Sequence, residues 1–267
     1  MKRWASIKLV VGTLKTIVLP TLSSNHMKNI FYVLFLTLLI AGCNKAPQPP
    51  IQLKDFFNSD ISVKKLGQRL IDLPHGLNPL EPSLEEAQEI FIAVHGGRSE
   101  GYEWIYPIKT IDTKQKYMFF YRWPDNGCFQ ESAEKLENEI KDILNQDKSI
   151  TKISLIGHSY GGILVSHVLK HWKINTPMEA HVVASPLLGT SMLNSICGYE
   201  PINKISNNTA LFEWRTQHQL DNAYKNLSED PQQINIQGSQ VTILPDTYKG
   251  NRLGHNWSIS WVADEVF

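Results

Sequence analysis

The stretch KISLIGHSYGGILVSHVL, residues 152–169, joins two apolar runs through a serine set among glycines. The first run has the length of a buried strand, and the second has the length of a helix that begins at once. Gly157, Ser159 and Gly161 fit the pattern G-x-S-x-G, in which a sharp strand-to-helix turn lifts a serine hydroxyl above a sheet. The alternative is a polar turn with no chemical role. The strand–turn–helix setting favours Ser159 as a nucleophile.

Apolar runs of strand length alternate with helical segments beyond residue 88. Strands are predicted at 89–97, 115–124, 152–156, 179–185, 209–216 and 239–245. Helices are predicted at 131–146, 162–172 and 257–267. Short apolar strands that alternate with helices pair in parallel and are covered by helices on both faces. The fold class is therefore α/β, and ligands are expected at the carboxyl ends of the strands. Residues 51–88 do not show this alternation. Residues 60–73 fit either a strand or a helix, and prolines interrupt the rest of the segment.

A serine nucleophile needs a base to take its proton. Among the nine histidines, His255 follows the last predicted strand after a loop and precedes the final helix. In the chain order serine, acid, histidine, this is where the base belongs. A surface histidine of a loop is the alternative. His158, directly before the serine, is expected to point away from the substrate.

The base in turn needs an acid that orients it, and in this order the acid follows the penultimate strand. Asp221 lies five residues beyond the end of that strand and is the predicted acid. Asp246 is the rival, although it would place acid and base on the same loop. Asp230 and Glu213 are weaker candidates.

The segment VHGGR, residues 94–98, ends the first predicted strand in glycines. Glycine lets a backbone N–H approach a ligand closely. One N–H from this loop and the N–H of Tyr160 would form a pair of donors for an oxyanion. Gly97 is the predicted loop donor, with Arg98 as the alternative. A glycine turn that binds nothing is the other interpretation.

The segments VHGG, GHSYGG, ASPLLGT and LGHNWS occur in the order and spacing of the α/β-hydrolases, which the chain resembles over residues 89–267. ASPLLGT is similar to the Ser-Pro-x-x-Gly segment of many bacterial lipases. The resemblance implies a mostly parallel sheet with helices on both faces, in which the first strands of the family are not recognisable. It implies a serine hydrolase that cleaves carboxylic esters or lipids and requires no metal or organic cofactor. The alternatives are a thioesterase or peptidase with the same triad and a catalytically inactive binding lipoprotein of this fold.

The segment MKNIFYVLFLTLLIAGC, residues 27–43, begins with a start-like Met27 and one basic residue, Lys28, followed by an apolar run. That run is too short to cross a bilayer and suits the core of a signal peptide. Its ending, LIAGC, resembles a bacterial lipobox, in which Cys43 becomes the acylated first residue. Translation is expected to begin at Met27.

Three regions follow from these features: a leader and lipoprotein signal peptide at 1–42, the lipidated Cys43 with a proline-rich tether at 43–50, and an α/β-hydrolase domain at 51–267. The expected location is the bacterial cell envelope, and Asn44 after the cysteine favours the outer membrane, facing the periplasm. The expected partners are a small-molecule ester or lipid and the membrane. Lys+Arg and Asp+Glu number 26 each, so no net charge favours nucleic acid.

Residues 186–208 form a long connection between two predicted strands and are predicted to shape the substrate pocket as a small cap. A solvent-exposed loop is the alternative. Cys128 and Cys197 both follow strand ends on the expected active-site face. They could form a disulfide in an oxidising compartment or stay as two thiols.

Overall fold

The computed structural model describes residues 50–82 and 87–267. The predicted signal peptide, Cys43 and the tether up to residue 49 lie outside the described residues. Among the helices of the described ranges, none is long and apolar enough to cross a membrane.

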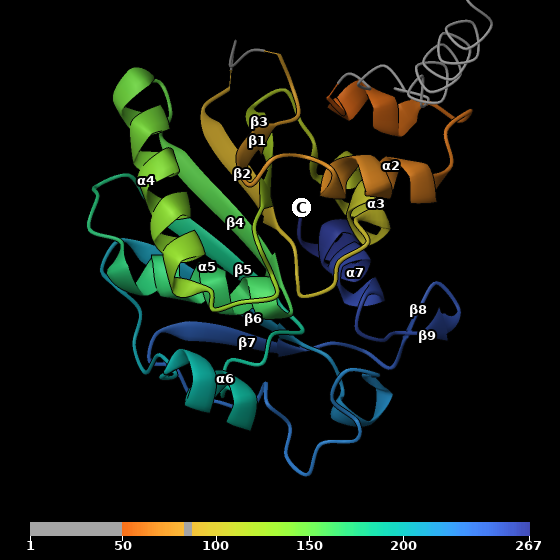
Figure 1. Cartoon of the computed structure of the whole chain (residues 1–267), viewed down its shortest axis with the longest axis vertical. Helices are drawn as coiled ribbons and strands as arrows, with labels where there is room; N and C mark the ends of the chain where they lie inside the picture. Colours follow the sequence, from red (N-terminus) through yellow and green to blue (C-terminus); the bar gives the residue numbers. More distant parts are fainter. Residues whose placement is uncertain (1–49, 83–86) are drawn as a thin grey trace, which may run out of the picture. The chain divides into compact units, whose positions relative to one another are not determined.

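One sheet of seven strands organises the described part of the chain, in the order β1-β3-β2-β4-β5-β6-β7 (Figure 1). Its strands are β1 (Gly76–Pro79), β2 (Glu89–Val94), β3 (Lys116–Arg122), β4 (Lys152–His158), β5 (Met178–Val183), β6 (Thr209–Arg215) and β7 (Ser239–Ile243). The edge strand β1 runs antiparallel to β3, and every other neighbouring pair is parallel. The predicted parallel sheet is therefore confirmed, with one short antiparallel strand from the segment that the sequence left unassigned.

Helices cover the sheet on both faces (Figure 1). The helices are α2 (Val63–Ile71), α3 (Tyr102–Ile111), α4 (Gln130–Gln146), α5 (Tyr160–His171), α6 (Ser191–Cys197) and α7 (Trp257–Val266). One buried cluster joins the sheet to α4 and α5, and a second joins its other face to α2, α3 and α7. Two 3₁₀ turns, η1 (Leu53–Phe57) and η2 (His218–Leu220), and a small hairpin of β8 (Thr247–Tyr248) and β9 (Asn251–Arg252) complete these elements.

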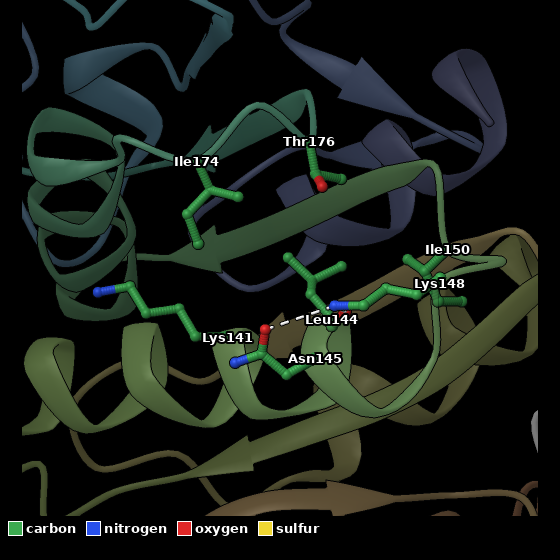
Figure 2. A pocket seen from close by; sticks show the side chains of 7 residues that line it. All are labelled: Lys141, Leu144, Asn145, Lys148, Ile150, Ile174 and Thr176. Atoms are coloured by element: carbon green, nitrogen blue, oxygen red, sulfur yellow. Dashed lines mark hydrogen bonds between the residues drawn. The ribbon is translucent and has the colours of Figure 1, made fainter.

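A cavity of about 430 Å³ lies before the amino ends of β4 and β5 (Figure 2). It is lined by the end of α4 and by the loops that lead into the two strands, through Lys141, Leu144, Asn145, Lys148, Ile150, Ile174 and Thr176. None of the predicted site residues lines it.

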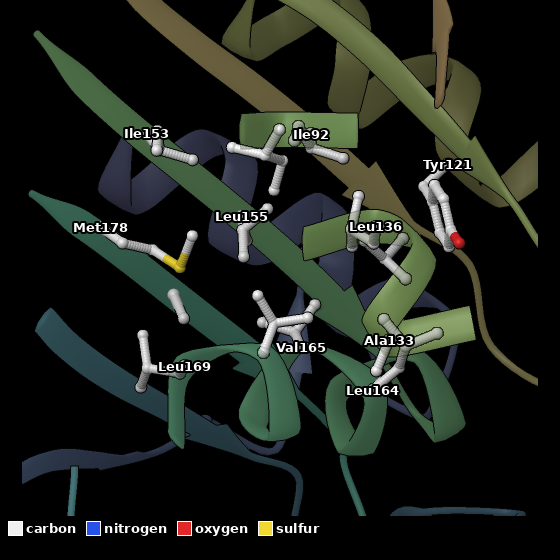
Figure 3. Packing of buried hydrophobic residues seen from close by; sticks show 14 of the residues in the cluster. Ile92, Tyr121, Ala133, Leu136, Ile153, Leu155, Leu164, Val165, Leu169 and Met178 are labelled. Carbon is white, nitrogen blue, oxygen red and sulfur yellow. The ribbon is translucent and has the colours of Figure 1, made fainter. Parts of the chain in front are cut away.

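The two hydrophobic clusters follow from the alternation of side chains along the strands. In β2, Ile90, Ile92 and Val94 face α4 and α5, whereas Phe91 and Ala93 face α3 and α7. Because both faces are covered, the strands read as continuous apolar runs. Figure 3 shows the first cluster, where side chains of α4 and α5 pack onto β2, β4 and β5.

The strands and helices predicted beyond residue 88 are all present, with ends that differ by a few residues. The sequence missed α3, α6 and the hairpin, and it did not resolve α2. In α3, Pro107 and several aromatic and β-branched residues lower the intrinsic helix propensity. Packing of α3 against α7 and α2 compensates for this local weakness.

Candidate active site

Ser159 occupies the turn between β4 and α5. Its backbone has φ 53° and ψ −122°, a conformation that a residue with a side chain rarely adopts. Such a conformation costs about 1–3 kcal/mol and persists only where the surroundings hold it. Here the Ser159 N–H donates to the Val183 carbonyl (2.9 Å), and its carbonyl accepts from the Ser185 hydroxyl (2.9 Å) and the Gly162 N–H (3.0 Å).

The two glycines of the turn are required by close backbone contacts. A Cβ on Gly157 would lie 2.7 Å from the Gly161 carbonyl oxygen, and a Cβ on Gly161 would lie 2.4 Å from the His95 carbonyl oxygen. Neither distance is tolerated by a real side chain. Glycine at these two positions therefore lets β4, α5 and the loop after β2 pass closely.

His255 lies in the loop between β9 and α7, and its Nδ1 is 2.9 Å from Oδ2 of Asp221. Asp221 ends the 3₁₀ turn η2 beyond β6 and is fully buried. Its carboxylate also accepts hydrogen bonds from the Thr216 hydroxyl (2.5 Å) and the Ala223 N–H (2.8 Å). The structure thus joins the predicted acid to the predicted base. The rival Asp246 is exposed and accepts a hydrogen bond from Gln217 instead.

The electrostatics of Asp221 favour its charged form. Burial raises the pKa of this carboxyl, but the hydrogen bond and the charge interaction with His255 oppose that effect, as do the bonds from Thr216 and Ala223. The pKa of Asp221 ends below its usual value. An ionised carboxylate at this position holds the His255 Nδ1–H and leaves Nε2 available as a base.

Ser159 and His255 line the same cavity, which has a volume of about 110 Å³. It lies beyond the carboxyl end of β4, as the fold class predicts for a ligand site. The other lining residues come from the loop after β2, from α3 and from the entry to α7: Gly96, Gly97, Arg98, Ser99, Glu100, Tyr102, Glu103, His158 and Asn256.

The loop after β2 brings its glycines over the strand-to-helix turn at Ser159. A Cβ on Gly96 would lie 3.0 Å from Cβ of Ser159, and a Cβ on Gly97 would lie 3.9 Å from Cβ of Tyr160. The Arg98 N–H donates to the Asp125 carboxylate. Since that donor is engaged, the geometry favours Gly97 over Arg98 as the loop donor.

His95 fixes this loop from within the core. Its Nδ1–H donates to the Gly96 carbonyl (2.8 Å), and its Nε2 accepts from Arg122 (3.0 Å) and the Trp123 N–H (3.2 Å). Burial lowers the pKa of His95 to about 4, so the ring is neutral at neutral pH and can make both kinds of bond. His95 belongs to the segment VHGG, but the sequence alone indicated no role for it.

The family model described as "Putative serine esterase (DUF676)" matches residues 85–242. The chain belongs to this serine esterase family. The match includes Ser159 and Asp221, and His255 lies beyond it. The protein is therefore a hydrolase of the serine esterase type with the α/β-hydrolase fold.

Two solved structures with the same fold are similar to the esterase. The Bacillus licheniformis lipase BlEst2 in its mature form is 14% identical with a TM-score of 0.50, covering 73% of this chain and 97% of that chain. A "putative thioesterase" from Silicibacter sp. tm1040 is 17% identical with a TM-score of 0.50, covering 85% of this chain and 93% of that chain. At such identities the likeness shows the fold alone. A search of curated proteins finds no match.

The orientation predicted for His158 in the esterase is wrong. Its ring lies 4.6 Å from the ring of His255 between centroids, and its Nε2 is 3.1 Å from the His255 carbonyl oxygen. His158 shares a face of β4 with Ile156, two residues earlier, and that face is covered by α7. The loop before α7 carries His255, so the two rings meet.

Tyr224 is a site residue that sequence reasoning missed. It is buried, its hydroxyl donates to the Ala184 carbonyl (2.7 Å), and its N–H donates to the Asp221 carbonyl (3.1 Å). Its ring stands at 90° to that of His255, with centroids 5.1 Å apart. Burial raises the pKa of Tyr224, and hydrogen bonding with the Ser159 hydroxyl acts in the opposite direction. Tyr224 thus contacts all three predicted triad residues, from a loop whose sequence carries no periodic signal.

Residues 186–208 do not line the cavity of Ser159, so the expectation that they shape that cavity is wrong. They contain α6 and pack inward through Leu193, Tyr199 and Ile202. A disulfide between Cys128 and Cys197 ties α6 to the loop after β3. Of the two interpretations left open, the structure contains the bonded form.

The described residues hold no group of three or more histidine, cysteine, aspartate or glutamate side chains arranged for a metal ion. The arrangement at Ser159 consists of a hydroxyl, an imidazole, a carboxylate and backbone N–H groups. These are the groups that acyl transfer uses.

Proposed function

We propose that the esterase hydrolyses carboxylic esters or lipids by two-step acyl transfer at Ser159, with His255 as the base and Asp221 as the acid that orients it. The observation that carries this proposal is that His255 shares a cavity with Ser159 while its Nδ1 is hydrogen-bonded to the buried Asp221. The strained backbone of Ser159 supports the same role, because such strain concentrates at functional sites.

In the first step, Nε2 of His255 takes the Ser159 proton as Oγ attacks the ester carbonyl carbon. The negative charge that develops on the carbonyl oxygen is stabilised by the N–H groups of Gly97 and Tyr160. The positive end of α5 adds to this stabilisation. The imidazolium then gives its proton to the leaving alcohol, which departs as the acyl-serine forms.

In the second step, a water molecule replaces the alcohol. His255 takes a proton from this water as the water oxygen attacks the carbonyl carbon of the acyl-serine. The carboxylic acid product then leaves, and His255 returns the proton to Ser159. Asp221 stays ionised throughout and stabilises the imidazolium. No step requires a metal or an organic cofactor.

The test is covalent labelling with a fluorophosphonate, which reacts with activated serines. We expect labelling of the wild-type protein at Ser159 and none of folded Ser159→Ala. Wild-type protein that is folded yet unlabelled, and inactive on p-nitrophenyl esters, would point to a binding lipoprotein of this fold. Thioester or peptide cleavage that exceeds ester cleavage at the same serine would instead place the substrate in another acyl class.

We also propose that a lipid on Cys43 holds the esterase at the bacterial outer membrane, facing the periplasm. The support is the sequence LIAGC after an apolar run, together with Asn44. Several acyl chains on one residue anchor stably, whereas one binds marginally. We expect radiolabelled palmitate to enter the wild type and not Cys43→Ala, and the label to fractionate with outer membranes.

A further inference from the structure

The cavity around Ser159 is too small and too polar to hold a whole ester substrate. It has about 110 Å³, and glycine backbone and polar side chains form most of its walls. This space suits the reacting carbonyl and its nearest atoms. An apolar part of the substrate therefore has to lie beside it.

A second cavity, of about 320 Å³, borders the first, because Tyr102, Glu103 and Asn256 line both. We call it the aromatic groove. Its other walls come from α3, the β8–β9 hairpin and α7, through Tyr106, Tyr248, Lys249, Trp257 and Ser260. These elements, which are far apart in sequence, lie next to one another (Figure 1).

The rings of this groove are unusually accessible for large side chains. Tyr102 is 37% exposed, Tyr106 is 42% exposed and Trp257 is 47% exposed. Large apolar side chains that gather at a hollow, rather than being scattered singly, indicate a binding surface. The position of the groove beside Ser159 assigns that surface to the substrate.

The walls of the groove are held in place without a ligand. Asp264 accepts from the hydroxyl of Tyr106 (2.6 Å) and pairs with Lys249 (2.6 Å). The Lys249 ammonium lies 4.6 Å from the ring centroid of Tyr106 and 4.9 Å from that of Tyr248. Trp257 packs against Tyr248 with centroids 5.9 Å apart and planes at 77°. Since these walls are ordered beforehand, a ligand binds with a smaller loss of conformational entropy.

The charged side chains that line the groove, Glu103 and Lys249, each have a partner within the protein. Lys249 is paired with Asp264, and burial raises the pKa of Glu103, while hydrogen bonding from Ser99 opposes that rise. A charged substrate group would lose its hydration here without gaining a free counter-charge. The groove therefore favours a neutral occupant.

We propose that the aromatic groove binds a neutral aryl group of the ester that Ser159 attacks, an inference that rests on the proposed function. Rings prefer edge-to-face or offset contacts with other rings, and such contacts add to the gain from burying area alone. An aryl group is also rigid, so it loses less conformational freedom than a flexible chain of the same size.

The test compares esters that differ only in the π-system of one ring. Ethyl 3-phenylpropanoate and ethyl 3-cyclohexylpropanoate place the ring on the acyl side, and the acetates of 3-phenylpropanol and 3-cyclohexylpropanol place it on the alcohol side. Acid release is followed at constant pH, so no p-nitrophenyl leaving group is needed. We expect kcat/KM to favour phenyl over cyclohexyl by roughly 2- to 10-fold on one of the two sides.

The variant Trp257→Leu keeps apolar bulk but removes a ring, and we expect it to bring the phenyl-to-cyclohexyl ratio close to one. Phe57→Ala, which removes an exposed aromatic side chain outside the groove, should keep the wild-type ratio. Equal rates for phenyl and cyclohexyl on both sides, or a preference that survives Trp257→Leu, would overturn the proposal.

A binding measurement separates this inference from the proposed function. Ligand-observed saturation-transfer NMR on Ser159→Ala compares the same two ethyl esters without turnover. Preferential binding of the phenyl ester, lost in Ser159→Ala combined with Trp257→Leu, supports the groove even if the wild type proves inactive. Hydrolysis of both esters without preference leaves the proposed function standing and contradicts the groove.

Discussion

Beyond the carboxyl ends of the strands, a cavity of about 110 Å³ holds Ser159 and His255, whereas the cavity before the amino ends of β4 and β5 has about 430 Å³ (Figure 2). The lining of the larger one includes two lysines, Lys141 and Lys148. In the smaller one, His255, the proposed base, is hydrogen-bonded to the carboxylate of Asp221, which has no exposed surface. The two cavities lie at opposite ends of the same strand, β4.

This difference shows that the direction of the parallel strands decides at which end of the sheet the helix termini favour an oxyanion. At the carboxyl end of β4, the amino terminus of α5 presents N–H groups and the positive end of its dipole. At the amino end, the carboxyl terminus of α4 presents carbonyl groups, and Lys148 donates to one of them (2.7 Å). The helix terminus therefore favours an oxyanion at the first place and opposes one at the second.

The largest effect is expected from Asp221, the proposed acid of the carboxyl-end cavity. Asp221→Asn removes the charge that holds the His255 tautomer, and we expect kcat to fall by about 10²- to 10⁴-fold. Asp246→Asn is the matched control and should stay within about twofold, because Asp246 is exposed and bonds Gln217. Kinetics of both variants on a short p-nitrophenyl ester decide the matter. Retained activity in the first together with collapse in the second would reverse the assignment.

A smaller effect is expected from Tyr224→Phe. The change deletes a hydroxyl that bonds the Ala184 carbonyl and interacts with Ser159, and a hydrogen bond of this kind is worth about 0.5–1.5 kcal/mol. We expect kcat to fall by about 2- to 10-fold with KM little changed, because the loss concerns the position of the nucleophile. A rise in KM with unchanged kcat would show that Tyr224 acts on substrate binding instead.

The histidines that surround the carboxyl-end cavity should make stability depend on pH. Burial lowers the pKa of His95 to about 4 and lowers that of His158 well below its usual value. In the unfolded chain these histidines become protonated near pH 6.5, whereas in the native state they stay neutral. The free energy of unfolding therefore decreases as the pH falls from about 6.5 to 4. For one histidine the slope approaches about 1.4 kcal/mol for each pH unit.

Urea unfolding at pH 7.5 and pH 5 measures this dependence. We expect the free energy of unfolding of His95→Asn to decrease less between pH 7.5 and pH 5 than that of the wild type, since the variant lacks one buried histidine with a lowered pKa. His171→Asn, at an exposed histidine on the far end of α5, is the control and should retain the wild-type loss. An equal loss in all three proteins would exclude His95 as a source of the dependence.

The local pattern around Ser159 was sufficient to predict the strand-to-helix turn, because this turn is encoded within one short stretch of sequence. Gly157 and Gly161 make contacts that any side chain would block, and chain order alone pointed to His255 and Asp221. The contribution of Tyr224 could not be predicted in this way, since it depends on where an irregular loop packs. The orientation of His158 was missed because it follows from the helix that covers its face of β4.

The smallest effect on activity is expected at the amino-end cavity. Lys148→Ala removes a side chain that donates to the Leu144 carbonyl near the end of α4. The loss should lower the free energy of unfolding by about 0.3–1 kcal/mol, because a cation there offsets the negative end of the helix dipole. We expect kcat/KM to stay within about twofold in the same preparation, since none of the predicted site residues lines this cavity. A tenfold loss of activity with normal unfolding would mean that this end of β4 takes part in catalysis, and the contrast between the two cavities would then fail.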